Sequence, residues 1–167
     1  MIFSLQHLIE ALRNELQQYG EMLALLDHQN DLVAAQDSDE VLDSINAIDS
    51  QGAAIQTARN NRQLAQRELA ENLKQSSQAN FAQIIPLIPA QYRPLVSALV
   101  QENNETLLRV RQRAQENHAL LRHSLNKMQR FLTSLSPQAQ EPSTANHQDG
   151  DCALMVEAGS PFYQAIV

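Results

Sequence analysis

Two long segments of this chain carry apolar residues at alternating spacings of four and three. Eight of nine such positions are apolar in the first 36 residues, and nine of twelve in residues 91–135. This spacing forms a stripe along an α-helix that packs beside another helix at a shallow angle. The first series is Leu5, Ile9, Leu12, Leu16, Tyr19, Leu23, Leu26, Asn30 and Val33. The second is Val96, Val100, Asn103, Leu107, Val110, Ala114, Asn117, Leu121, Ser124, Met128, Phe131 and Leu135. Both predict long, laterally packed helices.

The breaks between helices are marked by capping residues and prolines. Residues 37–40 (Asp, Ser, Asp, Glu) can accept hydrogen bonds from the free N–H groups of a helix start. We therefore expect helix 2–36 to be followed by an antiparallel helix over 39–75. Residues 80–94 contain three prolines but are too apolar for a free linker, which predicts a short helix over 80–88 at one end of the bundle. The last long helix is expected over 91–135, before Pro137.

The predicted fold is all-α: an elongated, antiparallel, coiled-coil-like bundle of three main helices and a short one, formed by residues 1–135. Residues 136–167 are expected to be a linker and a flexible C-terminal tail, because residues 136–151 are rich in Pro, Gln and Ser. Only 4% of the residues are aromatic and Trp is absent, as is typical of a seam filled by Leu, Ile, Val and Ala.

Helix 39–75 carries a less regular apolar stripe, and polar residues interrupt both this stripe and that of the last helix. In helix 39–75 the middle of the stripe includes Gly52, Arg59, Arg62 and Gln66. This indicates either a loosely packed stretch with arginine stems along the surface, or a bend, or a place where another protein docks. Asn103 and Asn117 occupy the same heptad position in the last helix. A buried Asn lowers stability but fixes the register of packed helices, because its amide needs a partner.

The charge and the single cysteine exclude several classes of protein. The net charge is −7 with only 12 Lys and Arg, so we expect no nucleic-acid partner. The alternation of Arg109, Arg111 and Arg113 with nearby acids is typical of a solvated helix face. With no signal-peptide pattern and no 18-residue apolar run, we expect no membrane insertion. Cys152 has no second cysteine to pair with, so we expect a cytoplasmic protein.

No catalytic motif is present, so the sequence predicts a protein that is not an enzyme, with no catalytic residues, metal, cofactor or small-molecule substrate. His118 and His123 are five residues apart and lie on different faces of a helix, which does not suit a metal pair. A weak alternative is histidine phosphotransfer. Residues 118–124 (HALLRHS) partly match that motif, but Leu121 and Arg122 stand where it has Lys and Gly.

The last helix carries the residues that resemble a known family. Residues 115–121 (QENHALL), followed by Leu125, Met128 and Leu132, are similar to the C-terminal signature of the FlgN family of flagellar export chaperones. Residues 104–108 (NETLL) repeat the motif. The order and spacing of the helices over residues 5–135 resemble the family as well. Two features differ: residues 48–51 (IDSQ) replace a frequent Glu-Lys pair, and residues 140–145 lack the Tyr-Gly linked to docking on the export gate.

The resemblance implies a cytoplasmic chaperone that binds the C-terminal segments of hook–filament junction proteins, prevents their premature assembly and delivers them to the type III export gate. Its expected partner-binding residues are Asn117, Leu121, Leu125, Met128, Phe131 and Leu132. For each of these residues the alternative is ordinary packing inside the bundle. The main alternative for the whole chain is a helical adaptor or scaffold with an unrelated partner, whose coiled coil serves self-association.

Overall fold

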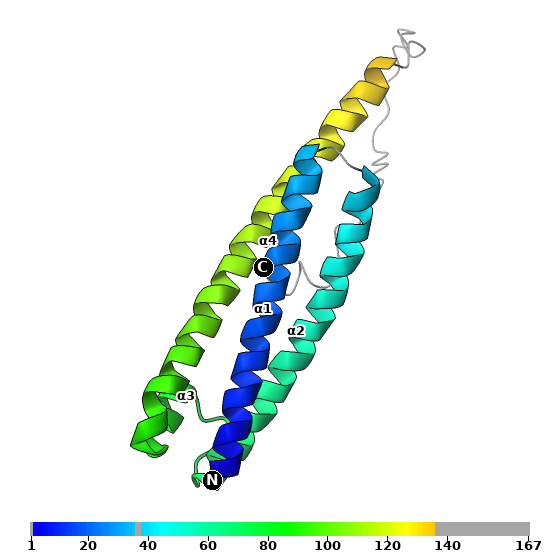
Figure 1. The fold of residues 1–167 in the computed structure, drawn as a ribbon. Helices are drawn as coiled ribbons and strands as arrows, with labels where there is room; N and C mark the ends of the chain where they lie inside the picture. The colour runs from blue at the N-terminus through cyan, green and yellow to red at the C-terminus, as the bar shows by residue number, and fades with distance from the viewer. Residues whose placement is uncertain (1, 36–37, 136–167) are drawn as a thin grey trace, which may run out of the picture.

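The computed structural model describes residues 2–35 and 38–135, and these ranges contain helices and no strand. Three long helices, α1 (Ile2–Ala35), α2 (Ser38–Asn72) and α4 (Arg93–Leu135), form an elongated bundle (Figure 1). Between α2 and α4 lie a short helix, α3 (Phe81–Ile84), and two 3-10 turns, η1 (Ile85–Leu87) and η2 (Ala90–Tyr92). The all-α bundle predicted from the sequence is confirmed. The expected linker and tail at 136–167 lie outside the described residues.

α1 lies between the other two long helices and packs against both, whereas α2 and α4 make few or no close contacts with each other. The α1–α2 pair is antiparallel, as the short connection between them requires. The α1–α4 pair is parallel. The side-chain amides of Asn103 and Asn117 donate hydrogen bonds to the backbone oxygens of Leu12 and Leu26, with the same difference in residue number in both pairs. Both asparagines are thus buried and have a partner on α1, as their heptad position predicted, and their role in fixing the register stays a prediction.

The apolar stripe on α1 is broad because it serves two neighbours. Leu12, Tyr19 and Leu26 of the four-three series are buried, and Leu8 and Met22, which lie beside that series, are fully buried too. A helix that contacts a single neighbour needs only a narrow stripe. The width of the stripe on α1 therefore matches its central place in the bundle.

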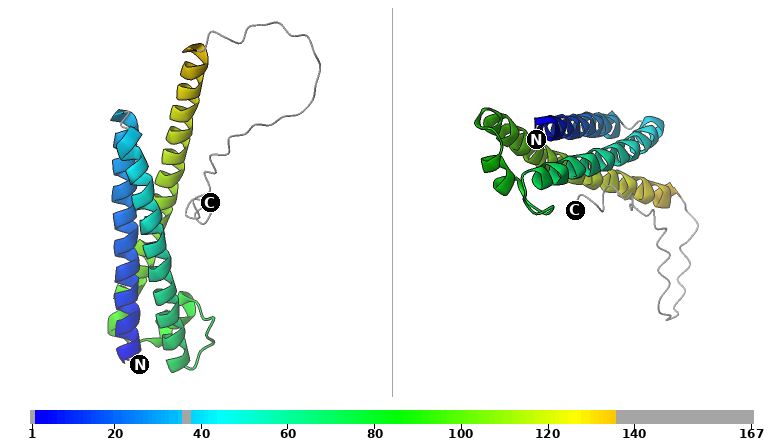
Figure 2. Two further views of the ribbon diagram at one scale, coloured as in Figure 1. Left: turned by 90° about the vertical axis from the view of Figure 1, so that its right-hand side faces the viewer. Right: turned by 90° about the horizontal axis from the view of Figure 1, so that it is seen from below.

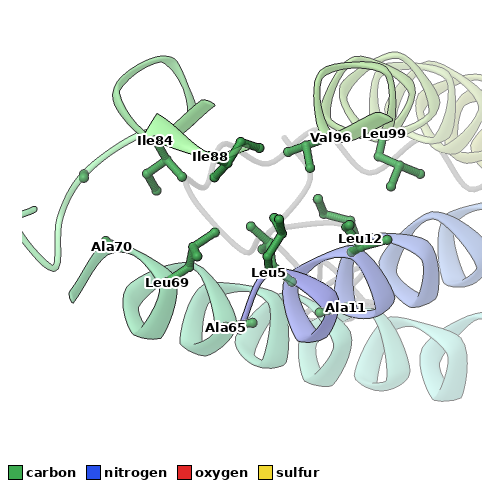
Figure 3. Packing of buried hydrophobic residues seen from close by; sticks show 13 residues of the cluster. Leu5, Ala11, Leu12, Ala65, Leu69, Ala70, Ile84, Ile88, Val96 and Leu99 are labelled. Carbon is green, nitrogen blue, oxygen red and sulfur yellow. The ribbon is translucent and has the colours of Figure 1, made fainter. Parts of the chain in front are cut away.

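One end of the bundle is closed by the segment between α2 and α4. Ile84 and Ile88 from this segment point toward Leu69 of α2, Leu5 of α1 and Val96 of α4 (Figure 3). The segment is held by a reciprocal cap, since Asn80 and Gln83 each accept a 3.0 Å hydrogen bond from the backbone N–H of the other. The expected short helix at the bundle end is present, as α3 and η1.

α2 ends earlier than the sequence indicated, at Asn72 rather than near residue 75. Lys74 adopts a left-handed backbone conformation with φ 56°. Its N–H donates to the Glu71 carbonyl at 2.9 Å, and the N–H of Gln75 donates to the Ala70 carbonyl at 2.8 Å. This pair of bonds closes a helix C-terminus. Glycine is the usual residue at such a helix end, so a lysine at this position does not indicate in the sequence that the helix ends.

The opposite end of the bundle is open. A second cluster of buried apolar residues joins α1, α2 and α4 along the middle of the bundle, and it includes Tyr19, Met22, Leu26, Ile48, Ile55, Val110 and Ala114. Beyond that cluster α4 diverges from the α1–α2 pair (Figure 2). Residues 122–134 of α4 are all exposed.

Candidate partner-binding surface

The last turns of α4, residues 118–135, are named here the α4 end. They expose a group of large apolar side chains to solvent: Leu120 (41% exposed), Leu125 (48%), Met128 (53%), Phe131 (61%) and Leu132 (58%). Single exposed apolar residues are normal on soluble proteins, but several large ones that lie together are typical of an interaction site.

These side chains continue the face by which α4 packs on α1. At about 100° per residue, they occupy an arc of roughly 140°, which also contains the buried Val110 and Asn117. Lower in the bundle this face is covered by α1. At the α4 end no described residue of another helix covers this face. The exposed arc therefore has the residue pattern of a helix-packing face.

The structure brings most of the predicted site residues together on this surface. Leu125, Met128, Phe131 and Leu132 are exposed there, and Leu121 is half-buried. Asn117 is 1% exposed, and its amide is bonded to Leu26 and lies 3.3 Å from Oε1 of Gln29. It thus marks the boundary at which packing on α1 ends.

Positive and negative charges lie on different segments at the open end of the bundle. Within residues 117–135 the chain has Arg122, Lys127 and Arg130 but no Asp or Glu. Residues 14–58, which cover most of α1 and the first half of α2, contain nine Asp and Glu and no Lys or Arg. Arg113 and Asp27 form a 2.8 Å ion pair that joins α4 to α1 below the point of divergence. This separation of charge is visible in the sequence only when the charged residues are counted segment by segment.

A buried ion cluster lies deeper in the bundle, beside a cleft of about 280 Å³ between the helices. Glu15, 3% exposed, is 2.9 Å from Nε of Arg62 and 3.9 Å from Nε of Arg59. It also accepts a 2.8 Å hydrogen bond from the hydroxyl of Tyr19. Burial raises the pKa of Tyr19 well above its usual range, and the charge of Glu15 and this hydrogen bond raise it further.

The ion cluster corrects the interpretation of the arginines in the middle of α2 as surface stems along a loosely packed stretch, while docking of another protein there stays a hypothesis. The Arg62 guanidinium binds the Glu15 carboxylate, donates to Oε1 of Gln66 at 3.1 Å and lies over the ring of Phe81, with Cζ 5.9 Å from its centroid. Gln66 in turn donates to the Ala79 carbonyl at 2.8 Å. The arginines thus connect α1, α2 and the start of α3. Only their pairing with Glu15, distant in sequence, reveals this role.

The described residues offer neither a metal site nor a membrane-spanning helix. Among residues 2–35 and 38–135, no group of three or more His, Cys, Asp and Glu is placed to hold a metal ion. Within the same part of the chain, no helix combines the length and hydrophobicity that a membrane crossing requires.

Comparison with known proteins gives one match. The family model of the FlgN protein matches residues 1–150, which include all of the helices described above. Neither the search of curated proteins nor the search of solved structures gave a match. The match covers most of the 167 residues and agrees with the resemblance of residues 5–135. The chain belongs to the FlgN family.

Proposed function

We propose that this protein is a cytoplasmic chaperone that binds the C-terminal segments of hook–filament junction proteins along the α4 end. By covering these segments it prevents their premature assembly, and it delivers them to the type III export gate. Membership of the FlgN family supports a role as a flagellar export chaperone in general. The observation that carries the specific proposal is the group of large apolar side chains that α4 exposes beyond the core.

The physical argument is one of complementary burial. An amphipathic client segment must bury its apolar stripe, and helix-in-groove binding does this without changing the fold of the host. Full burial of a Leu, Met or Phe side chain contributes about 1.5–3 kcal/mol. Four of these side chains are about half exposed: Leu125, Met128, Phe131 and Leu132. Burial of the exposed half against a partner therefore contributes a substantial part of this free energy.

The predicted site residues have different places in this proposal. Leu125, Met128, Phe131 and Leu132 contact the client directly, with the half-buried Leu121 at the lower edge of the contact. Asn117 supports the surface from below, because its bond to the Leu26 carbonyl holds α4 in register on α1.

The proposal is tested by calorimetric titration with C-terminal peptides of the hook–filament junction proteins. The wild-type protein is expected to bind them with a negative heat-capacity change, since apolar surface is buried. The double substitution Leu125→Ala, Met128→Ala should weaken binding at least about tenfold and leave the melting temperature unchanged.

Leu108→Ala is the matched control. Leu108 lies on the same helix and is 66% exposed, but at about 100° per residue it faces away from the apolar arc. Its substitution should alter neither binding nor melting. A wild-type protein that is folded and gives no heat with any junction-protein peptide would refute the proposed function. A double variant that melts much lower would show that the α4 end is part of the core.

A further inference from the structure

The cations of the α4 end border its apolar face on both sides. At about 100° per residue, Arg122 lies beyond one edge of the arc formed by the exposed apolar side chains, and Lys127 lies beyond the other edge. Arg130 lies farther round on the side of Lys127. All three residues are exposed, and no Asp or Glu occurs in residues 117–135.

This local excess of positive charge stands against the charge of the chain as a whole, which is −7. The acidic α1–α2 segment lies on the other side of the divergence seen in Figure 2. Arg122 and Lys127 border the apolar face itself, so they are the charges next to a partner that packs there. The contribution of a charge falls with its distance, over a screening length of about 8 Å at physiological ionic strength.

We propose that the α4 end selects an amphipathic client helix whose apolar stripe is flanked by Asp and Glu, and that Arg122, Lys127 and Arg130 contact those acids. The inference rests on the proposed function and specifies the chemistry of its client. The apolar arc continues the helix-packing face of α4, which favours a helical occupant. The bordering cations favour acidic flanks, because complementary charges fix orientation and raise the rate of association.

The same charge pattern argues against two other occupants. A flat surface of anionic lipid would approach the cations of α4 but would be repelled by the acidic segment at the same end of the molecule. A second copy of this chain would place two sets of Arg122, Lys127 and Arg130 close together if the two α4 ends packed against each other, and like charges oppose such pairing.

The test uses two peptides of about 20 residues with the same leucine stripe at helical spacing, one flanked by Glu and the other by Lys. The wild-type protein should bind the Glu peptide about tenfold more tightly than the Lys peptide at low salt, since each exposed ion pair contributes modestly. The difference should shrink as salt is raised.

The triple variant Arg122→Glu, Lys127→Glu, Arg130→Glu is expected to reverse this preference. The matched control is Arg13→Glu, Arg67→Glu, Arg109→Glu, which makes the same change in net charge at exposed arginines outside the α4 end. The control should keep the wild-type preference. Circular dichroism and melting curves establish that both variants are folded.

The outcomes separate the two proposals. Equal binding of both peptides by the wild-type protein and the triple variant would overturn the inference, while binding of junction-protein peptides would leave the proposed function intact. Absence of binding to any junction-protein peptide would remove the proposed function itself. Two results would also overturn the inference: binding to vesicles of phosphatidylglycerol that the triple variant abolishes, and a wild-type dimer that the triple variant dissociates.

Discussion

Gly20 lies in the middle of α1, and a Cβ added there would meet nothing within 4 Å beyond its chain neighbours and the backbone of its own helix. Glycine within a helix costs about 1 kcal/mol relative to alanine, because more backbone freedom is lost on folding. We expect Gly20→Ala to raise the free energy of unfolding by up to about 1 kcal/mol, as measured by urea denaturation. Ala24→Gly, at an exposed position one turn further along α1, should lower it by a similar amount. Destabilisation by Gly20→Ala would contradict the open space around this residue.

We expect the free energy of unfolding to fall at alkaline pH because of Tyr19. Burial raises its pKa above the unfolded value, and the charge of Glu15 and its hydrogen bond to the phenol add to the shift, while Arg59 and Arg62 oppose it. The stabilisation is therefore complete below the unfolded pKa of about 10 and is lost as the pH rises beyond that value.

Above pH 10 or so, this single group should lower the free energy of unfolding by about 1.4 kcal/mol for each pH unit. Denaturation at a series of alkaline pH values should show this slope for the wild-type protein and a flatter one for Tyr19→Phe. Tyr92→Phe removes a different tyrosine hydroxyl and should leave the slope as it is in the wild type. If Tyr19→Phe retained the full slope, the loss of stability would have another source.

Single residues also show which parts of this structure could be predicted from the sequence. The heptad position of Asn103 and Asn117 sufficed to predict that both would be buried and would need a hydrogen-bond partner. The sequence could not identify their partners as the Leu12 and Leu26 carbonyls, because any backbone oxygen of a neighbouring helix can accept such a bond. The Glu15–Arg62 pair was missed for a related reason, since residues 47 positions apart meet only once the helix order and register are known.

At the scale of the helix, α4 combines two environments in one continuous element. Its first part is buried against α1, and residues 122–134 are exposed. An unpacked helical stretch of this length is marginal in water, because most helix stability in proteins comes from tertiary packing. Backbone amides there should therefore open more readily than those below.

Amide hydrogen exchange should show this gradient along α4. We expect amides of residues 122–134 to exchange on the order of 100-fold faster than those of residues 96–117. Addition of a bound client peptide should slow exchange at the α4 end, because packing restores protection. Uniform protection along α4 in the free protein would mean that another element covers its end.

Element boundaries illustrate a second limit of the sequence. The capping residues at 37–40 and the prolines in residues 80–94 correctly placed the breaks between helices. The end of α2 was misplaced because Lys74 adopts a backbone conformation that its residue type does not favour. The direction of α4 relative to α1 was likewise not determined by periodicity, which is the same for parallel and antiparallel packing.

At the scale of the whole molecule, the buried clusters and the candidate partner surface occupy different parts of the bundle. The core joins α1, α2 and α4 up to about Asn117, and the exposed apolar side chains lie beyond it. The sequence predicted residues of the α4 end as a site but could not tell which of them were core. Leu121 and Met128 occupy equivalent positions of the four-three series, one heptad apart, and only the divergence of α4 separates the half-buried position from the exposed one.

The parallel pairing of α1 and α4 has a consequence for the order of folding. α1 and α2 are joined by a short connection, so their contacts close a small loop, whereas the bonds of Asn103 and Asn117 to α1 each join residues 91 apart. Closing the larger loop carries a greater entropic penalty, and local contacts form faster. We expect the α1–α2 hairpin to form first and to serve as the template on which α4 docks. The α4 end takes no part in that docking, so the three long helices can complete their packing while this surface stays exposed.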